Sequence, residues 1–192
     1  IDDWLKQSGA KLASGFGHVE FVYDFRDGGT ADGWLHALGK YSLRSSGHMA
    51  ETIFGAHIYN VPVIYKDEPQ SYTDTPPGLS TRLFLRLGQN LGTLTDAICH
   101  LIYPASLPWH KTSCTQIILH DGNGAVVAQK QVAIACSGSL FWIYSEMFDA
   151  GERKAAGDGA YVIVRDATCR LFGFHGLMQG GDSFSLDHMF GF

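Results

Sequence analysis

The stretch TQIILHDGNGAVVAQK, residues 115–130, decides the fold class of this chain. It joins two runs rich in aliphatic and β-branched residues through the polar segment HDGNG at 120–124. Asp-Gly and Asn-Gly pairs readily supply the positive φ angles that tight hairpin turns need. The stretch therefore predicts a β-hairpin, and it makes antiparallel pairing the expected arrangement of its neighbours.

Similar strand-like runs recur along the chain and are separated by turns, with 23 glycines as punctuation. In TRLFLRL, residues 81–87, leucines recur at 83, 85 and 87, and the opposite face carries Arg82 and Arg86 with Phe84 between them, as in a half-buried strand. Nine predicted strands with little helix indicate an all-β fold, either an antiparallel sandwich or a barrel. The predicted strands are 18–25, 57–65, 81–87, 114–119, 126–136, 140–145, 160–164, 169–174 and 183–190.

Helical features are confined to two segments. Residues 2–13 begin with Asp2, which is a suitable N-cap, and carry spaced apolar residues, so a helix is predicted there. Residues 148–156 are charged and short, and they predict a loop or a single helical turn. Residues 66–78 contain three prolines and predict a loop.

The composition is that of one compact domain that does not bind polyanions. Hydrophobic residues make up 45% of the 192 residues, charged residues make up 17%, and the net charge is −5. The hydrophobic share excludes a disordered chain. Scattered lysines and arginines argue against nucleic acid and anionic lipid as main partners. No break in composition is present, so we predict a single β domain over 1–192, with 1–15 as an N-terminal helix or arm.

Three features bear on the compartment. No apolar run approaches the roughly 18 residues needed to span a bilayer, so no membrane span is predicted. The first residues, IDDW, lack the basic and apolar regions of a signal peptide, which leaves a processed secreted chain and a cytosolic one open. The abundance of Gly, Tyr, Trp and Ser favours a secreted or periplasmic protein. The four cysteines allow two disulfides or buried thiols, and both remain open: Cys99, Cys114, Cys136 and Cys169.

Both ends of the chain carry acidic residues next to strand-like runs. The segment YDFRDG at 23–28 is followed by DGW at 32–34, and the chain closes with FSLDHM at 184–189. These segments resemble the first and last strands of jelly-roll carbohydrate-binding domains. The resemblance implies an antiparallel, jelly-roll-like β-sandwich that binds sugars.

The same resemblance implies a structural calcium ion. In that family, acidic residues near the chain ends supply hard oxygen ligands, which suit Ca²⁺. The matching residues in this chain are Asp24, Asp27 and Asp187. Arg26 departs from the family pattern, in which an acidic residue is more usual at this position.

A second resemblance covers the later part of the chain, over 116–136 and 160–176. The hairpin leads into a strand that ends in Cys136, and CRLFGFHG at 169–176 follows later. These segments resemble the later strands of calycin-type barrels of the allene-oxide-cyclase and dirigent kind. This alternative implies an eight-stranded barrel around an apolar ligand. The family's Gly-Gly-Thr-Gly turn is replaced here by RDAT at 165–168.

Aromatic residues form the predicted ligand-binding surface. The loop YPASLPWH at 103–110 is stiffened by two prolines, and loops on a rigid β scaffold commonly carry binding residues. Aromatic faces stack on the CH groups of sugar rings. The alternative is that Trp109 closes one end of the core. The predicted ligand-binding residues are Trp109, Tyr103, His110, Trp142 and Tyr144, and Phe172 and Phe174 extend the same flat platform.

Patterns for catalysis and metal binding are missing from the sequence. SGS at 137–139 is not a GxSxG nucleophile elbow, and no phosphate-binding glycine loop precedes a helix. The nine histidines show no HxH or HExxH spacing, so each is expected to be a surface or strand residue. His175 and His188 are the two most expected to converge. No catalytic residue is predicted.

Three functions are therefore expected, in decreasing order of support. The first is a non-catalytic module that binds a carbohydrate-like ligand, with structural calcium as the only cofactor. The second is a small β-barrel enzyme or carrier for an apolar ligand. The third is a structural subunit of a homo-oligomeric assembly, since low charge and many aromatic residues suit an interface.

Overall fold

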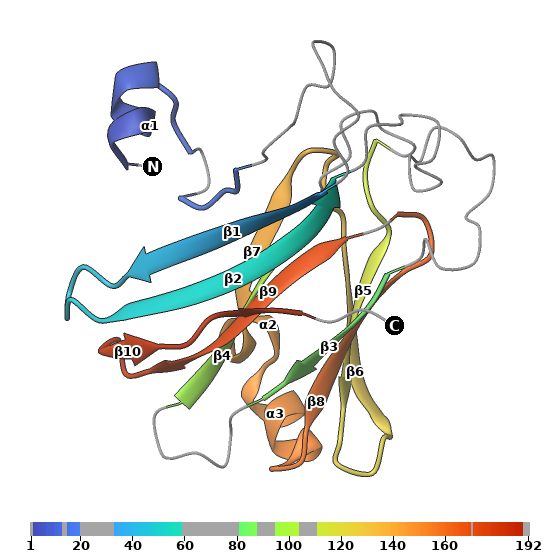
Figure 1. Cartoon of the computed structure of the whole chain (residues 1–192). Coiled ribbons are helices and arrows are strands. Elements are labelled where there is room, and N and C mark those ends of the chain that lie inside the picture. Colours follow the sequence, from blue (N-terminus) through green and yellow to red (C-terminus); the bar gives the residue numbers. More distant parts are fainter. Residues whose placement is uncertain are drawn as a thin grey trace.

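The computed structural model of this chain describes residues 2–12, 15–19, 33–58, 81–87, 95–103, 111–169 and 171–189. Over these residues the chain is an all-β protein whose paired strands are all antiparallel (Figure 1). This confirms the predicted fold class. The described strands form three open sheets and do not close into a barrel, so the sandwich and not the eight-stranded barrel describes them.

Two of the sheets face each other across the core. Sheet I has the strand order β3 (Thr81–Arg86), β8 (Tyr161–Asp166), β5 (Thr115–His120) and β6 (Val126–Val132). Sheet II has the order β10 (Ser183–Phe184), β9 (Phe172–Gln179), β4 (Thr95–Ile102) and β7 (Ser139–Ile143), and β11 (Asp187–His188) also pairs with β9. From β3 to β9 each connection crosses from one sheet to the other, except for the β5–β6 hairpin. This alternation is the topology of a jelly-roll-like sandwich.

The β5–β6 hairpin is confirmed, with its turn at 121–124. The Asp121 side chain accepts hydrogen bonds from the backbone N–H groups of Asn123 at 2.9 Å and Ala125 at 2.8 Å. Gly124 has φ 89°, in the left-handed region that favours glycine. The local turn chemistry therefore fixes the register of this pair.

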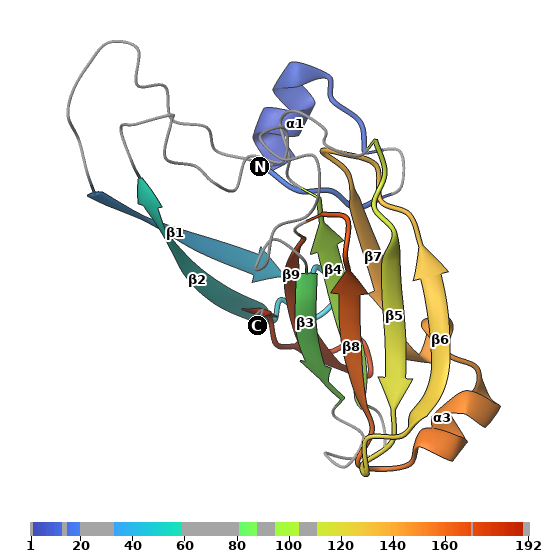
Figure 2. The ribbon, with the colours of Figure 1, turned by 90° about the vertical axis from the view of Figure 1, so that its right-hand side faces the viewer.

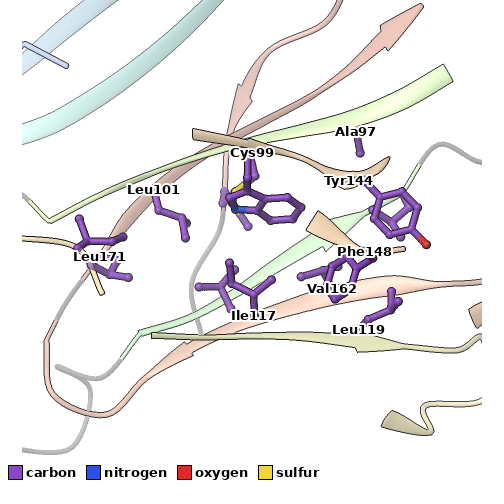
Figure 3. Packing of buried hydrophobic residues seen from close by; sticks show 14 of the residues in the cluster. Ala97, Cys99, Leu101, Ile117, Leu119, Tyr144, Phe148, Val162 and Leu171 are labelled. Atoms are coloured by element: carbon purple, nitrogen blue, oxygen red, sulfur yellow. The ribbon is translucent and has the colours of Figure 1, made fainter. Parts of the chain in front are cut away.

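The core lies between the two sheets and is built from alternate residues of their strands (Figure 3). Cys99 and Leu101 of β4 face Ile117 of β5 and Val162 of β8, and all four are 0% exposed. Phe148 fills the space beside them, also at 0%. Because side chains alternate along a strand, the residues between these point away from the core.

The helices differ from the sequence expectation. Helix α1 (Asp2–Ser8) ends before Gly9, whose φ of 68° stops it short of the predicted residue 13. Helix α2 (Tyr144–Met147) replaces the end of the strand predicted at 140–145. Helix α3 (Ala150–Ala156) lies where a loop or single turn was predicted. Among the described residues, no helix has the length and hydrophobicity needed to cross a bilayer.

A capping box explains why α3 forms despite its charge. The Asp149 side chain accepts a hydrogen bond from the Glu152 backbone N–H at 2.9 Å, and the Glu152 side chain accepts one from the Asp149 N–H at 2.9 Å. Two of the unpaired N–H groups at the helix start are thereby satisfied. Lys130 of β6 forms an ion pair with Glu152 at 2.6 Å, which joins α3 to sheet I.

A third sheet stands apart from the sandwich and was not predicted at its observed position. It consists of β1 (Gly33–Ser42) and β2 (Met49–Ile58), which pair along their full length. We refer to this hairpin as the arm. In Figure 2 the arm diverges from the sandwich toward its Gly33 and Ile58 end. Most of the strand predicted at 18–25, most of that at 57–65 and the whole loop at 66–78 lie outside the described residues, and residues 18 and 19 are not in a strand.

The opposite end of the arm is attached to sheet II. The Ser46 hydroxyl donates a hydrogen bond to the Asp182 carbonyl at 2.6 Å, and His48 Nε2 lies 2.8 Å from the Phe184 carbonyl oxygen. The rings of His48 and Phe184 are in edge contact, with centroids 5.4 Å apart. The tip of the arm is therefore held by the β9–β10 turn and by β10.

None of the four cysteines forms a disulfide in this structure. Cys99 and Cys169 are buried, Cys136 is partly buried and Cys114 is exposed. Burial raises the pKa of the Cys99 thiol, and burial followed by the nearby Asp166 carboxylate raises the pKa of Cys169. Of the two alternatives that the sequence left open, the structure shows thiols.

Candidate ligand-binding surface

Three of the predicted binding residues lie inside the protein. Tyr103 is 0% exposed, and Trp142 and Tyr144 are each 4% exposed. The prediction that they form an exposed platform is wrong, because large aromatic side chains fill the space between the sheets. Trp142, for example, packs edge-on against Phe148 with ring centroids 6.5 Å apart. Trp109 and His110 lie outside the described residues.

A different set of aromatic side chains is brought together on the outer face of sheet II. His100 of β4 lies opposite Phe141 of β7 on one side and Phe174 of β9 on the other. His188 of β11 lies opposite Phe174. Residues directly opposite each other in antiparallel strands point to the same face. The four side chains therefore form one row across four strands, which we call the aromatic row.

The neighbouring residues show that this row faces away from the core. Cys99 and Trp142, each adjacent in sequence to a member of the row, fill the core instead. The members of the row are half-buried, and Phe172, two residues from Phe174 on the same face, is 54% exposed. An exposed aromatic ring therefore lies beside the β9 member of the row.

The N-terminal segment covers the other side of the row. The Phe16 ring is edge-on to the His100 ring, with centroids 5.9 Å apart, and lies 6.2 Å from the ring of Phe141. Within the described residues, His100 Nε2 is buried and has no hydrogen-bond partner. Burial, helped by the nearby His18, lowers the pKa of His100 to about 4. His100 is therefore neutral at pH 7, as its apolar surroundings require.

The β11 end of the row carries polar groups. His188 Nδ1 lies 3.3 Å from Asp187 Oδ1, and Asp187 lies opposite His175 in the β9–β11 ladder. Burial lowers the pKa of His175, the Asp187 carboxylate opposes this shift, and His188 adds to it. His175 and His188, the pair expected to converge, lie on adjacent strands but on opposite faces: His175 shares the face of Cys99, and His188 shares the outer face with Phe174.

The described residues contain no cluster of three side chains suited to a metal ion. Of the predicted calcium ligands, only Asp187 is described, and its side chain is 65% exposed and in contact with His188. Asp24 and Asp27 lie outside the described residues. The calcium site therefore stays a prediction.

A buried polar cluster near the end of β8 is structural. Asp166 is 2% exposed, and its Oδ2 accepts a hydrogen bond from the Thr115 hydroxyl at 2.8 Å. Its Oδ1 accepts bonds from the Thr168 N–H, the Thr168 hydroxyl and the Cys169 N–H at 2.6–3.1 Å. A carboxylate satisfied in this way holds the turn at 165–168, the position where the barrel family has glycines.

Sequence reasoning missed the centre of this surface. His100 lies on β4, a strand that was not predicted, and Phe141 was not singled out within its predicted strand. Phe174 and His188 had each been noted, but for different reasons. No pattern within a single segment reveals the row, because its members come together only through the register of three strand pairs.

The outer face of sheet II presents aromatic rings together with the imidazole groups of His100 and His188. Aromatic faces attract CH groups, and imidazole groups pair with hydroxyls. Comparison of the chain with protein-family models, curated proteins and solved structures found no match.

Proposed function

We propose that this chain is a non-catalytic β-sandwich module that binds a carbohydrate-like ligand on the outer face of sheet II. The observation that carries the proposal is the aromatic row with Phe172 exposed beside it. Sugar rings combine an apolar face of CH groups with a rim of hydroxyls. The row offers aromatic faces, and the imidazole of His188 at its β11 end offers a hydrogen-bonding group, so both halves of such a ligand find a partner.

The packing of the interior favours the surface over a cavity. Tyr103, Phe148, Leu101 and Ile117 are each 0% exposed and belong to one cluster between the sheets. An apolar ligand would have to displace these side chains, at a cost of several kcal/mol for close-packed groups of this size. This is the reason for proposing a binding surface in preference to a barrel-type enzyme or carrier.

A glycan array probed with the purified full chain tests the proposal. We expect binding to at least one glycan class, and the bound glycan is then titrated by calorimetry. Phe172→Ala should weaken binding about five- to tenfold, because an exposed ring that stacks on a sugar contributes about 1–1.5 kcal/mol. Val126→Ala is the matched control, since Val126 is an exposed apolar strand residue (60%) of sheet I.

Two further results bear on the proposal. Absence of binding to every glycan, with a folded protein confirmed by circular dichroism, would overturn it. Repeating the array with a calcium chelator tests whether glycan binding depends on calcium. Binding that requires calcium and is lost in Asp187→Ala would support the proposed ion, and unchanged binding would remove calcium from the function. A secreted or periplasmic location belongs to the same proposal.

A further inference from the structure

One face of the arm presents apolar side chains to solvent. Six residues at three register positions point to this face, and all six are exposed. Leu38 (51%) pairs with Ile53 (61%), and Met49 (69%) pairs with Ser42. Between them lies the pair Lys40 and Glu51. We call these six residues the arm face.

The opposite face of the arm is the less exposed one. Thr52 is 5% exposed there, Ala37, Gly39 and Ala50 are partly buried, and Tyr41 is 42% exposed. The arm contacts β10 and β11 through β2. The sandwich therefore lies on the β2 side of the arm. Exposed apolar side chains clustered on one face of a hairpin mark an interaction site.

We propose that the arm face binds the arm face of a second copy of this chain, about a two-fold axis that runs along the arm between β1 and β2. This operation carries each residue of β1 onto the position of its register partner in β2. Leu38 of one copy then packs on Ile53 of the other, and the reverse, so the apolar pair is covered twice by one interface.

The charges of the arm face fit this arrangement. Lys40 and Glu51 are register partners, and Lys40 Nζ lies 3.2 Å from Glu51 Oε1 within one chain. The two-fold operation places each Lys40 opposite the Glu51 of the other copy, which gives two attractive pairs across the interface. A two-fold axis perpendicular to the strands, through Leu38 and Ile53, would instead place Lys40 of one copy away from Glu51 of the other. The two attractive charge pairs across the interface would then be lost.

The position of the sandwich also permits the contact. Because each sandwich lies on the β2 side of its own arm, the two-fold axis puts the two sandwiches on opposite sides. Two strands of ten residues provide a small interface, below the standard size for stable complexes. We therefore expect a weak dimer, with a dissociation constant of about 10–300 μM.

Sedimentation equilibrium of the full chain from about 10 μM to about 1 mM measures this association. Lys40→Glu and Glu51→Lys, each tested alone, should weaken dimerisation at least about fivefold, because like charges then face each other across the axis. An equimolar mixture of the two variants should associate about as tightly as the original chain. In the mixture the internal Lys40–Glu51 pair remains broken in both chains, so only contacts between copies can restore binding.

Ile53→Asp should abolish the dimer, and Val126→Asp, an equally exposed position on sheet I, should leave it unchanged. Circular dichroism of each variant confirms that the chain is folded. A mass of one chain, 21.0 kDa, up to about 1 mM would overturn the proposal. A mixture that associates no better than either variant would also overturn it. So would an Ile53→Asp chain whose self-association is unchanged, and loss of glycan or vesicle binding in that chain would assign the arm face to that other partner.

Discussion

The β5–β6 hairpin and the arm are both antiparallel hairpins, yet they are stabilised in different ways. Ile117 and Leu119 of β5 are 0% exposed and pack across the core, whereas Leu38 and Ile53 of the arm are both more than half exposed. Aliphatic strand residues of similar kind thus serve as core in one hairpin and as surface in the other. An apolar strand residue stabilises the fold only where a second layer covers it.

The largest expected effect separates the two regions by stability. Phe148→Ala should lower the free energy of unfolding by about 3–5 kcal/mol, because a fully buried ring leaves a cavity. Ile53→Ala, on the exposed arm face, should change it by less than about 0.5 kcal/mol. Urea unfolding measures both values. An equal loss in the two variants would show that the arm face is covered in the isolated protein.

An intermediate effect is expected from acid. The pKa of His100 is about 4 in the folded chain and about 6.5 when unfolded, so the unfolded state binds the additional proton between these values. The contribution of His100 to the free energy of unfolding should be fully present above pH 6.5. It should be lost as the pH is lowered toward 4, by about 1–2 kcal/mol once the partial exposure of the side chain is allowed for. His100→Phe should flatten this part of the pH profile, measured by thermal unfolding.

The lowered pKa of His175 contributes to the same pH profile, so some acid sensitivity should remain in His100→Phe. A profile identical to that of the original chain would show that His100 is not buried behind Phe16.

The smallest effect is expected at the arm tip. Ser46→Ala removes an exposed hydrogen bond to the Asp182 carbonyl and should cost about 0.5–1 kcal/mol. Since the bond joins the arm to sheet II, hydrogen exchange should accelerate in β1 and β2 and stay unchanged in β5. Faster exchange in both regions would mean that the arm and the sandwich unfold together.

The sequence predicted those elements that depend on local chemistry. The β5–β6 hairpin was identified from its turn residues, and β3 and β8 were found within one or two residues from alternation and β-branched runs. Helix α3 was predicted only as a loop or a single turn, because its charged composition suggests a loop and its capping box was not recognised. Strand β4 was missed because DAICHLI, buried on both faces at several positions, lacks a clean alternation.

The candidate site could be predicted only in part. Phe172 and Phe174 belonged to the expected aromatic platform and lie on the outer face of sheet II. Tyr103, Trp142 and Tyr144 were assigned to the same platform and are core residues. Composition indicates that aromatic residues matter here, but exposure depends on which face of a strand meets the other sheet.

By itself, the sequence determined an all-β antiparallel domain, because turn residues and hydrophobic alternation act over a few neighbouring positions. Only the tertiary structure decided which rings are core and which lie on the surface. It also decided that His100, Phe174 and His188 share one row, and that the arm leaves one face exposed. Strand register and the packing of one sheet on the other involve residues tens of positions apart in the sequence. No pattern within a single segment indicates which of these residues will pair.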